Sequence, residues 1–245
     1  MRANLVLILI FGLVSFTYAQ SSINNQITQN AFQEFSAAAN NKMYTGAGVP
    51  VFNHLEDTRG SRYLYDHWVH GLIINAKGDT ISNDSFFLNY DKISESLYLT
   101  VDRQSVVEIN KKEIRGFTLW KDGKEIIFHR VYLIDNKNLF HVLVHDTVGF
   151  SLYKLYHTKF RKADYTNDGI HESGKNYNEF VDAPEYFVLY PDRRVVEIIE
   201  PSRKVIGKAF NLNPLHDKVL AYLSAHPNEE VNEELLRNLV LYLNQ

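Results

Sequence analysis

The sequence predicts a mainly β fold of the α+β class: an antiparallel meander, sandwich or barrel-like sheet followed by a C-terminal tail of two helices. Three observations predict it. Short runs rich in β-branched and aromatic residues recur between residues 68 and 199, with turn residues between them. Their connections are too short for the helical crossovers that parallel strands need. Apolar residues in the last part of the chain change to helical spacing.

The predicted strands follow one another closely. The pair Asp122-Gly123 between two β-forming runs is a strong local signal for a tight hairpin. Between residues 148 and 160 two sets of side chains alternate, as they do when successive residues face opposite sides of a sheet. The strands are predicted over 68–75, 86–90, 97–101, 106–109, 117–120, 126–134, 139–144, 148–160, 185–190 and 194–199.

The tail is predicted to form two amphipathic helices. The first starts after Pro214, a residue suited to the first turn of a helix. Asn232 can cap the second, and Glu233 and Glu234 then lie in its first turn, where the helix dipole favours negative charge. Each helix has an apolar stripe that must be buried, against the sheet or against the other helix.

Composition divides the chain into four predicted parts. These are a signal peptide (1–19), a polar N-terminal arm or linker (20–60), an antiparallel β domain (61–212) and a helical hairpin packed on it (213–245). Within the linker, a short helix is expected over 26–39, because apolar residues there fall on one side of a helix.

The first nineteen residues have the order of a secretory signal peptide. Arg2 precedes an apolar run over 5–16, and the small residues Thr17 and Ala19 mark a cleavage site. The apolar run is shorter than the ~20 residues that a membrane-spanning helix needs. We therefore expect cleavage after Ala19, no transmembrane anchor in the mature chain, and a periplasmic, extracellular or cell-surface location.

Composition excludes several classes of chemistry. The chain has no cysteine, which removes disulfides, thiol catalysis, iron–sulfur clusters and Cys-ligated zinc. Its core must instead rely on burial, for which 15 Phe, 15 Tyr and 2 Trp supply large side chains. The formal net charge is -3, and basic residues cluster tightly only at 159–162 and 193–194. Nucleic acid is therefore not an expected partner.

Several short segments resemble a family of small exported proteins of Bacteroidota that has no assigned function. The segments are Gly60-Ser61-Arg62-Tyr63-Leu64, Trp68, Gly71-Leu72-Ile73, Gly78, Leu88-Asn89-Tyr90-Asp91, Ile109, Ile114-Arg115-Gly116-Phe117, Phe160-Arg161-Lys162-Ala163-Asp164-Tyr165, Glu233-Glu234-Leu235-Leu236 and Tyr242. They are turn glycines, strand aromatics and helix residues. The resemblance implies an envelope location and a β-then-helix order, and it brings no catalytic set.

One loop offers oxygen ligands in a pattern close to a calcium loop. Asp164 and Asp168 occupy its first and fifth positions, and His171 and Glu172 follow. The twelfth position is Lys175, where a calcium-binding EF-hand needs a bidentate glutamate. The sequence therefore leaves a looser calcium site as the one candidate metal or cofactor site, beside the alternative of a solvated loop.

The histidines could supply a different metal site. His141 and His145 are predicted to share a strand face, but ~13 Å of strand rise separates them, too far for one ion to bridge. The alternative is a cluster formed across strands from His129, His141 or His157. Histidines at a surface or half buried in a sheet remain the simpler interpretation.

Exposed aromatic side chains are the remaining candidates for binding. Trp68, Trp120, Tyr63 and Tyr65 would form a flat strip for a glycan or a peptide if they face outward. The competing interpretation is that they pack the β core. The sequence carries no Gly-x-Ser-x-Gly elbow, no His-Glu-x-x-His motif and no phosphate-binding glycine loop.

These observations favour a non-catalytic binding or scaffolding module of the cell envelope, with an envelope protein or a glycan as its partner. The alternative is a periplasmic hydrolase or metal-dependent enzyme whose site assembles only in three dimensions. A binding module should present a free sheet edge or an exposed apolar surface. An enzyme should present converging polar groups with shifted pKa values.

Overall fold

The computed structural model describes residues 44–48, 57–103, 105–211 and 215–245. It confirms the mainly β, antiparallel α+β fold with helices at the C-terminal end. The predicted signal peptide (1–19), the predicted helix over 26–39 and Pro214 lie outside the described residues.

One eight-stranded sheet runs through the whole molecule, in the order β17-β16-β11-β10-β9-β8-β3-β4, with every neighbouring pair antiparallel. Its hairpins are the short connections that the sequence predicted. The strands are β3 (His70–Asn75), β4 (Thr80–Ile81), β8 (Ile114–Lys121), β9 (Lys124–His129), β10 (Phe140–Val144), β11 (Ser151–Leu155), β16 (Glu185–Leu189) and β17 (Val195–Ile199).

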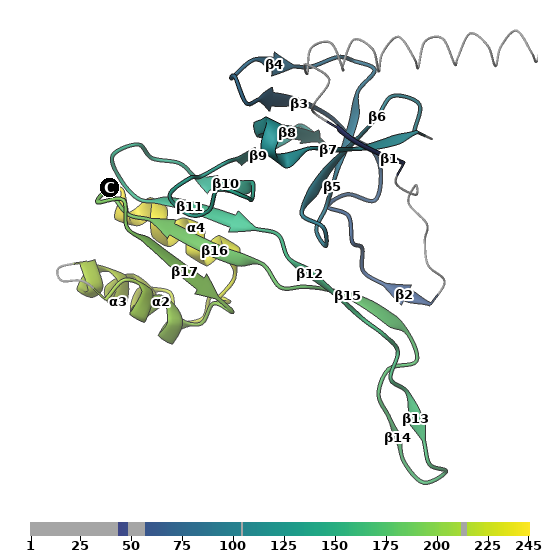
Figure 1. Ribbon diagram of the computed structural model, residues 1–245. Coiled ribbons are helices and arrows are strands. Elements are labelled where there is room, and N and C mark those ends of the chain that lie inside the picture. The colour runs from purple at the N-terminus through teal and green to yellow at the C-terminus, as the bar shows by residue number, and fades with distance from the viewer. Residues whose placement is uncertain (1–43, 49–56, 104, 212–214) are drawn as a thin grey trace, which may run out of the picture.

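A second sheet covers the β3, β8 and β9 end of this long sheet, as Figure 1 shows. Its order is β1-β7-β6-β5, and its strands are β1 (Tyr44–Gly48), β5 (Phe87–Asp91), β6 (Ser96–Thr100) and β7 (Val106–Ile109), followed by a short 3-10 helix, η1 (Lys111–Glu113). Leu88, Leu99 and Ile109 of this sheet meet Phe117 and Phe128 of the long sheet in one buried cluster. We call this end the sandwich half.

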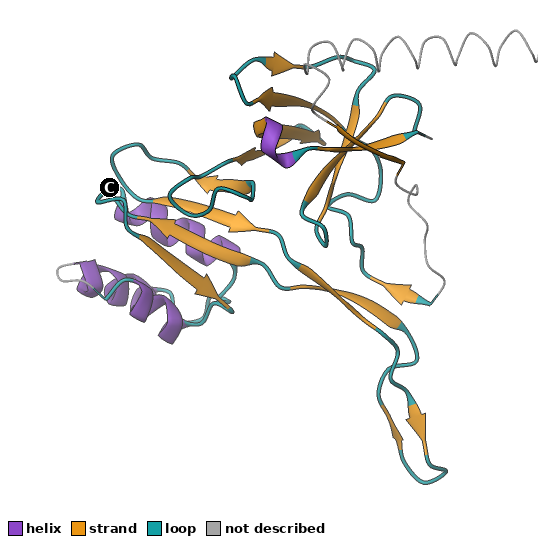
Figure 2. Ribbon diagram, viewed as in Figure 1, coloured by secondary structure: helices purple, strands orange, loops and turns teal. Residues whose placement is uncertain are grey.

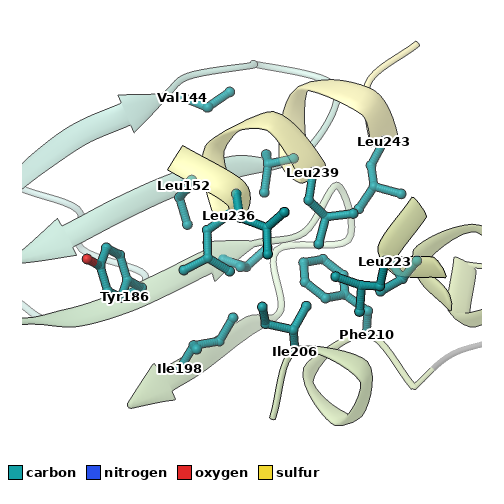
Figure 3. Packing of buried hydrophobic residues seen from close by; sticks show 14 of the residues in the cluster. Val144, Leu152, Tyr186, Ile198, Ile206, Phe210, Leu223, Leu236, Leu239 and Leu243 are labelled. Carbon is teal, nitrogen blue, oxygen red and sulfur yellow. The ribbon is translucent and has the colours of Figure 1, made fainter. Parts of the chain in front are cut away.

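Helices cover the other end, formed by β10, β11, β16 and β17. They are α2 (Arg203–Ala209), α3 (Leu215–Ala225) and α4 (Glu233–Leu243). Figure 3 shows Leu236 and Leu239 of α4 lying between the strands and Phe210, beside Leu223 of α3. We call this end the helical half. None of the helices in the described part of the chain is long and apolar enough to cross a membrane.

The helical part is longer than the predicted 213–245, and it has three helices among the described residues instead of two. The additional helix α2 lies inside the predicted β domain (61–212). Ser202 caps it by accepting a hydrogen bond from the Val205 amide at 3.2 Å. The Arg203 guanidinium also donates to the carbonyls of Leu223 and His226, at 2.8 and 2.6 Å. A seven-residue helix is too short to show a helical period, so these long-range contacts decide it.

Three further predictions differ from the structure. The predicted strand over 126–134 ends at His129 with β9. The run over 148–160 is not one strand but two, β11 in the long sheet and β12 (Thr158–Arg161) in another sheet. The strand breaks at Tyr156 and His157, whose side chains contact His141 of β10 and Glu95 in the turn before β6. The predicted linker (20–60) also contributes strands β1 and β2 (Thr58–Arg59), which pair with β7 and β15 (Asn178–Asp182).

Candidate functional site

A two-stranded ribbon projects from the body of the protein, and Figures 1 and 2 show it pointing away from both halves. We call residues 158–182 the hairpin arm. At its base β12 pairs with β15 in antiparallel register, and at its tip β13 (Thr166–Asn167) pairs with β14 (Glu172–Ser173). Residues 159–176 are all exposed. The loop that carries the candidate calcium ligands therefore lies in a hairpin.

Polar contacts, among them one ion pair, hold the base of the hairpin arm to the sandwich half. Lys92, in the turn between β5 and β6, is almost fully buried and donates to both carboxylate oxygens of Asp182, at 2.6 and 2.9 Å. The Thr158 hydroxyl donates to the same carboxylate at 2.5 Å. Beside them the His157 ring lies 3.2 Å from Glu95. Lys92 is almost buried but the Asp182 side chain is 58% exposed, so this pair and the Thr158 bond position the base with a modest gain in stability.

The two edges of the hairpin arm differ at its base. The outer edge of β15 is covered by β2, which pairs with it in parallel. The Arg59 guanidinium lies 3.7 Å from the centre of the Tyr177 ring and strengthens this contact. Among the described residues, no strand pairs with the outer edge of β12. Unpaired backbone N–H and C=O groups on such an edge can accept another strand.

Apolar side chains lie along the hairpin arm in contact with solvent. Phe160 is 41% exposed, Tyr165 46% and Ile170, at the tip, 85%. Only Phe160 packs on a second aromatic ring, that of Phe180 on the paired strand, at 5.0 Å. An isolated two-stranded ribbon is only marginally stable in water. These side chains therefore form a surface suited to contact with another molecule.

The four residues of the predicted calcium site all lie on this ribbon. Oδ1 of Asp168 accepts the Ile170 and His171 amides at 2.9 and 2.7 Å, and these bonds lower the pKa of Asp168. Oδ1 of Asp164 accepts the Lys175 amide at 2.8 Å, and Glu172 accepts from Asn167. The carboxylates thus shape the hairpin. Within the described residues no group of three His, Asp or Glu side chains is arranged for a metal ion.

The four aromatic candidates lie together on the sandwich half, and each is partly buried. Tyr63 meets Tyr98 edge to face, at 6.4 Å between ring centres. The Lys121 ammonium lies 5.0 Å from the centre of the Tyr65 ring. Trp120 is paired across strands with His70 of β3. They pack on their own body more than they face solvent, so an open aromatic strip remains a prediction.

A second group of polar side chains lies between the sheet and helix α4. We call it the junction cluster, and it consists of His141, Lys154, Tyr156, Tyr186 and Glu233. The Tyr156 hydroxyl lies 3.2 Å from Nδ1 of His141, and the two rings stack. Lys154 donates to Glu233 at 2.6 Å, and Tyr186 donates to the same carboxylate at 3.3 Å.

Burial shifts the titrations in the junction cluster. Desolvation, with the Lys154 charge as a smaller cause, lowers the pKa of His141 to about 4. Desolvation also raises the pKa of Tyr156 and Tyr186 above its ordinary value. His141 is therefore neutral near pH 7, and both phenols keep their protons. Because the five groups satisfy one another, their evident role is to join α4 to the sheet.

The histidines do not combine as predicted. His141 faces the junction cluster, whereas His145 contacts the Tyr153 hydroxyl at 3.3 Å on the opposite face of the sheet. A β-bulge between Val142 and Val144 causes this, because one extra residue reverses the alternation of faces. His157 contacts Glu95, and no group of three His, Asp or Glu side chains that could hold a metal ion occurs among the described residues.

Comparison with family models, with curated proteins and with solved structures finds no match in any of the three. The functional argument therefore depends on geometry. Sequence reasoning missed Lys92, Glu95 and Asp182, which anchor the hairpin arm. No local signal could have found the pair Lys92–Asp182, since 90 positions separate its members.

Proposed function

We propose that the chain is an exported protein of the cell envelope that acts as a non-catalytic binding or scaffolding module and contacts its partner through the hairpin arm. One observation carries the proposal: a ribbon whose residues 159–176 are all exposed and which, within the described part of the chain, is fixed to the body at its base. Such a ribbon has no hydrophobic core of its own. Its exposed edge and side chains are therefore better explained as a binding surface than as a source of stability. The leader-like sequence over 1–19 supports export.

The construction of the base supports a presenting role. Ordering a residue costs about 1–2 kcal/mol of backbone entropy, and a free ribbon recovers little of this by burial. The base offsets part of the cost with the Lys92–Asp182 pair and with β2. A segment that needed only to connect β12 to β15 could be a short turn. The extended ribbon is therefore better explained by contact with a partner.

A second candidate function is an enzyme centred on the junction cluster. The low pKa of His141 favours it, because shifted titrations gather at catalytic sites. Nearby, the buried Tyr90 hydroxyl has no hydrogen-bond partner among the described residues. Yet Lys154, Tyr186 and Glu233 already bond to one another. This mutual saturation makes the binding module the better-supported function.

The absence of cysteine gives a direct test of the hairpin arm. A single cysteine introduced by Ile170→Cys can carry a photo-crosslinker at the tip of the arm. Lys77→Cys, in the exposed turn after β3, is the matched control on the body. In intact cells we expect a discrete cross-linked species from position 170 and none from position 77. Equal cross-linking from both positions, or none from position 170, would contradict a binding role for the arm.

Export has its own measurement. We expect the mature protein, purified from the cell that makes it, to begin at Gln20 and to fractionate with the periplasm, the outer surface or the medium. Mass spectrometry of the intact chain gives the first residue. A protein that keeps residues 1–19 and fractionates with the cytoplasm would refute the envelope location without affecting the role of the hairpin arm.

A further inference from the structure

Charge is distributed unevenly along residues 158–168, the first strand of the hairpin arm and the segment that follows it. Lys159, Arg161 and Lys162 lie at the base, and Asp164 and Asp168 lie toward the tip. In the part of the chain that the structure describes, the three basic side chains form no ion pair. Oδ1 of each carboxylate holds backbone amides, and Oδ2 of Asp168 lies 4.0 Å from Nδ1 of the His171 ring. Both acidic residues remain exposed to solvent.

This distribution is complementary to itself. If two ribbons lie side by side and antiparallel, the base of each meets the tip of the other. Residues 159–162 of one copy then lie opposite residues 164–168 of the second copy, so positive faces negative at both ends of the contact. A two-fold axis gives every favourable pair twice, which is how a symmetric interface gains from one self-complementary segment.

We infer that the partner of the hairpin arm is a second copy of this chain, paired arm to arm along residues 159–168, with β12 of each copy opposite residues 164–168 of the other. The inference rests on the proposed function, because it names the partner of the same surface. Pairing would join two marginal two-stranded ribbons into one wider sheet, which is a more stable unit in water. It would also cover Phe160 and Tyr165, which are 41% and 46% exposed in the single chain.

Charge complementarity favours a second copy over an unrelated protein. A partner with one sign of charge would match either the basic base or the acidic tip and would repel the other. A second copy of this chain, lying antiparallel, places its acidic tip opposite the basic base and its basic base opposite the acidic tip. The contact is narrow, so we expect a reversible dimer that weakens as salt rises, because screening acts strongly on exposed charges.

Charge reversal tests the inference on the full chain. An all-acidic arm carries K159E, R161E and K162E. An all-basic arm carries D164N, D168N, I170K and E172K, where asparagine keeps the ability to hold the hairpin amides. Sedimentation of the wild-type chain should show a dimer that grows with protein concentration. Each variant alone should raise the dissociation constant roughly tenfold or more, and an equimolar mixture of the two should restore the dimer.

A matched control changes net charge equally but away from the arm. Lys77 and Lys137 are exposed on turns of the body and Lys124 is exposed at the start of β9, and K77E/K124E/K137E should dimerise like the wild type. Far-ultraviolet circular dichroism checks that every variant is folded. A wild-type chain that stays monomeric at all concentrations, or a mixture of variants that fails to associate, would overturn arm-to-arm pairing.

Cross-linking at position 170 separates this inference from the proposed function. A species of twice the chain mass supports the second copy as the partner. If the cross-linked species contains a different protein while the purified chain remains monomeric, the inference fails and the binding module stands. If position 170 gives no cross-linked species at all, both fail.

Discussion

The two halves of the long sheet bury their apolar inner face in different ways. In the sandwich half the inner face packs against a second sheet, and aromatic rings of Tyr90, Phe117 and Phe128 stack in its centre. In the helical half the same sheet packs against α2, α3 and α4, and its core is mainly aliphatic. Because β9 and β10 pair directly, no linker separates the halves. The difference teaches that one continuous sheet can support two distinct cores.

The largest expected effect on the free energy of unfolding comes from removing one large buried side chain from each core in turn. Phe128→Ala removes a ring that is 0% exposed from the sandwich half, and Leu239→Ala removes a fully buried side chain from α4. We expect each to lower the free energy of unfolding by about 3–5 kcal/mol, since both leave a cavity that the core cannot fill. Chemical denaturation of the wild type and both variants gives these free energies.

The same variants test whether the halves unfold together. Trp68 and Trp120 both lie in the sandwich half, so tryptophan fluorescence reports on it, whereas ellipticity at the helical band reports on the helical half. With one shared sheet, the two signals should give coincident transitions in every variant. Separate transitions in Leu239→Ala would show that the sandwich half stays folded when the helical half unfolds, and that the sheet does not unfold as one cooperative unit.

A smaller effect should come from acid, through the junction cluster. The folded chain holds His141 neutral with a pKa of about 4, against an ordinary 6.5. Between these values the unfolded chain binds the proton first, so stability is full above pH 6.5 and is lost as pH falls toward 4. The largest possible loss from this residue is about 3 kcal/mol. Denaturation at a series of pH values measures it.

His141→Gln is the control for the pH dependence, because glutamine can still bond to the Tyr156 hydroxyl but does not titrate in this range. The variant should lose less stability than the wild type between pH 6.5 and 4. Carboxylates elsewhere titrate in both chains, and their effect cancels in the difference. Equal pH profiles for the two chains would mean that His141 is solvated in the folded protein.

The smallest effect concerns the helical half alone. The Asn232 side chain caps α4 by accepting a hydrogen bond from the Leu235 amide at 3.1 Å. Asn232→Ala should cost about 1 kcal/mol, and Asn232→Ser, which keeps a capping oxygen, should cost much less. Thermal unfolding followed by circular dichroism distinguishes them. Similar losses for both substitutions would indicate that packing, not capping, sets the start of α4.

The fold class could be predicted because its signals are local. The Asp122-Gly123 turn does join β8 to β9, and Asn232 does cap α4. Strand β7 has the predicted bounds, 106–109. Each of these depends on a few neighbouring residues, whose turn chemistry or capping oxygen acts over short range.

The candidate site could not be predicted in the same way. The alternation over 148–160 runs straight through the point where the chain leaves one sheet for another, because Tyr156 and His157 find partners far along the sequence. The calcium-like spacing of Asp164 and Asp168 arose from hairpin turns, which also place carboxylates at short intervals. Only the assembled sheets show that this segment projects.

The anchoring of Asp182 by Lys92 sets the geometry of any complex. Because the base of the hairpin arm is attached to the sandwich half, a molecule bound to the tip would also fix the orientation of the two halves. The length of the hairpin arm would then set the distance between the bound partner and the two hydrophobic cores. Shortening the ribbon by whole pairs of residues would bring them closer in steps of one strand repeat, without altering either core.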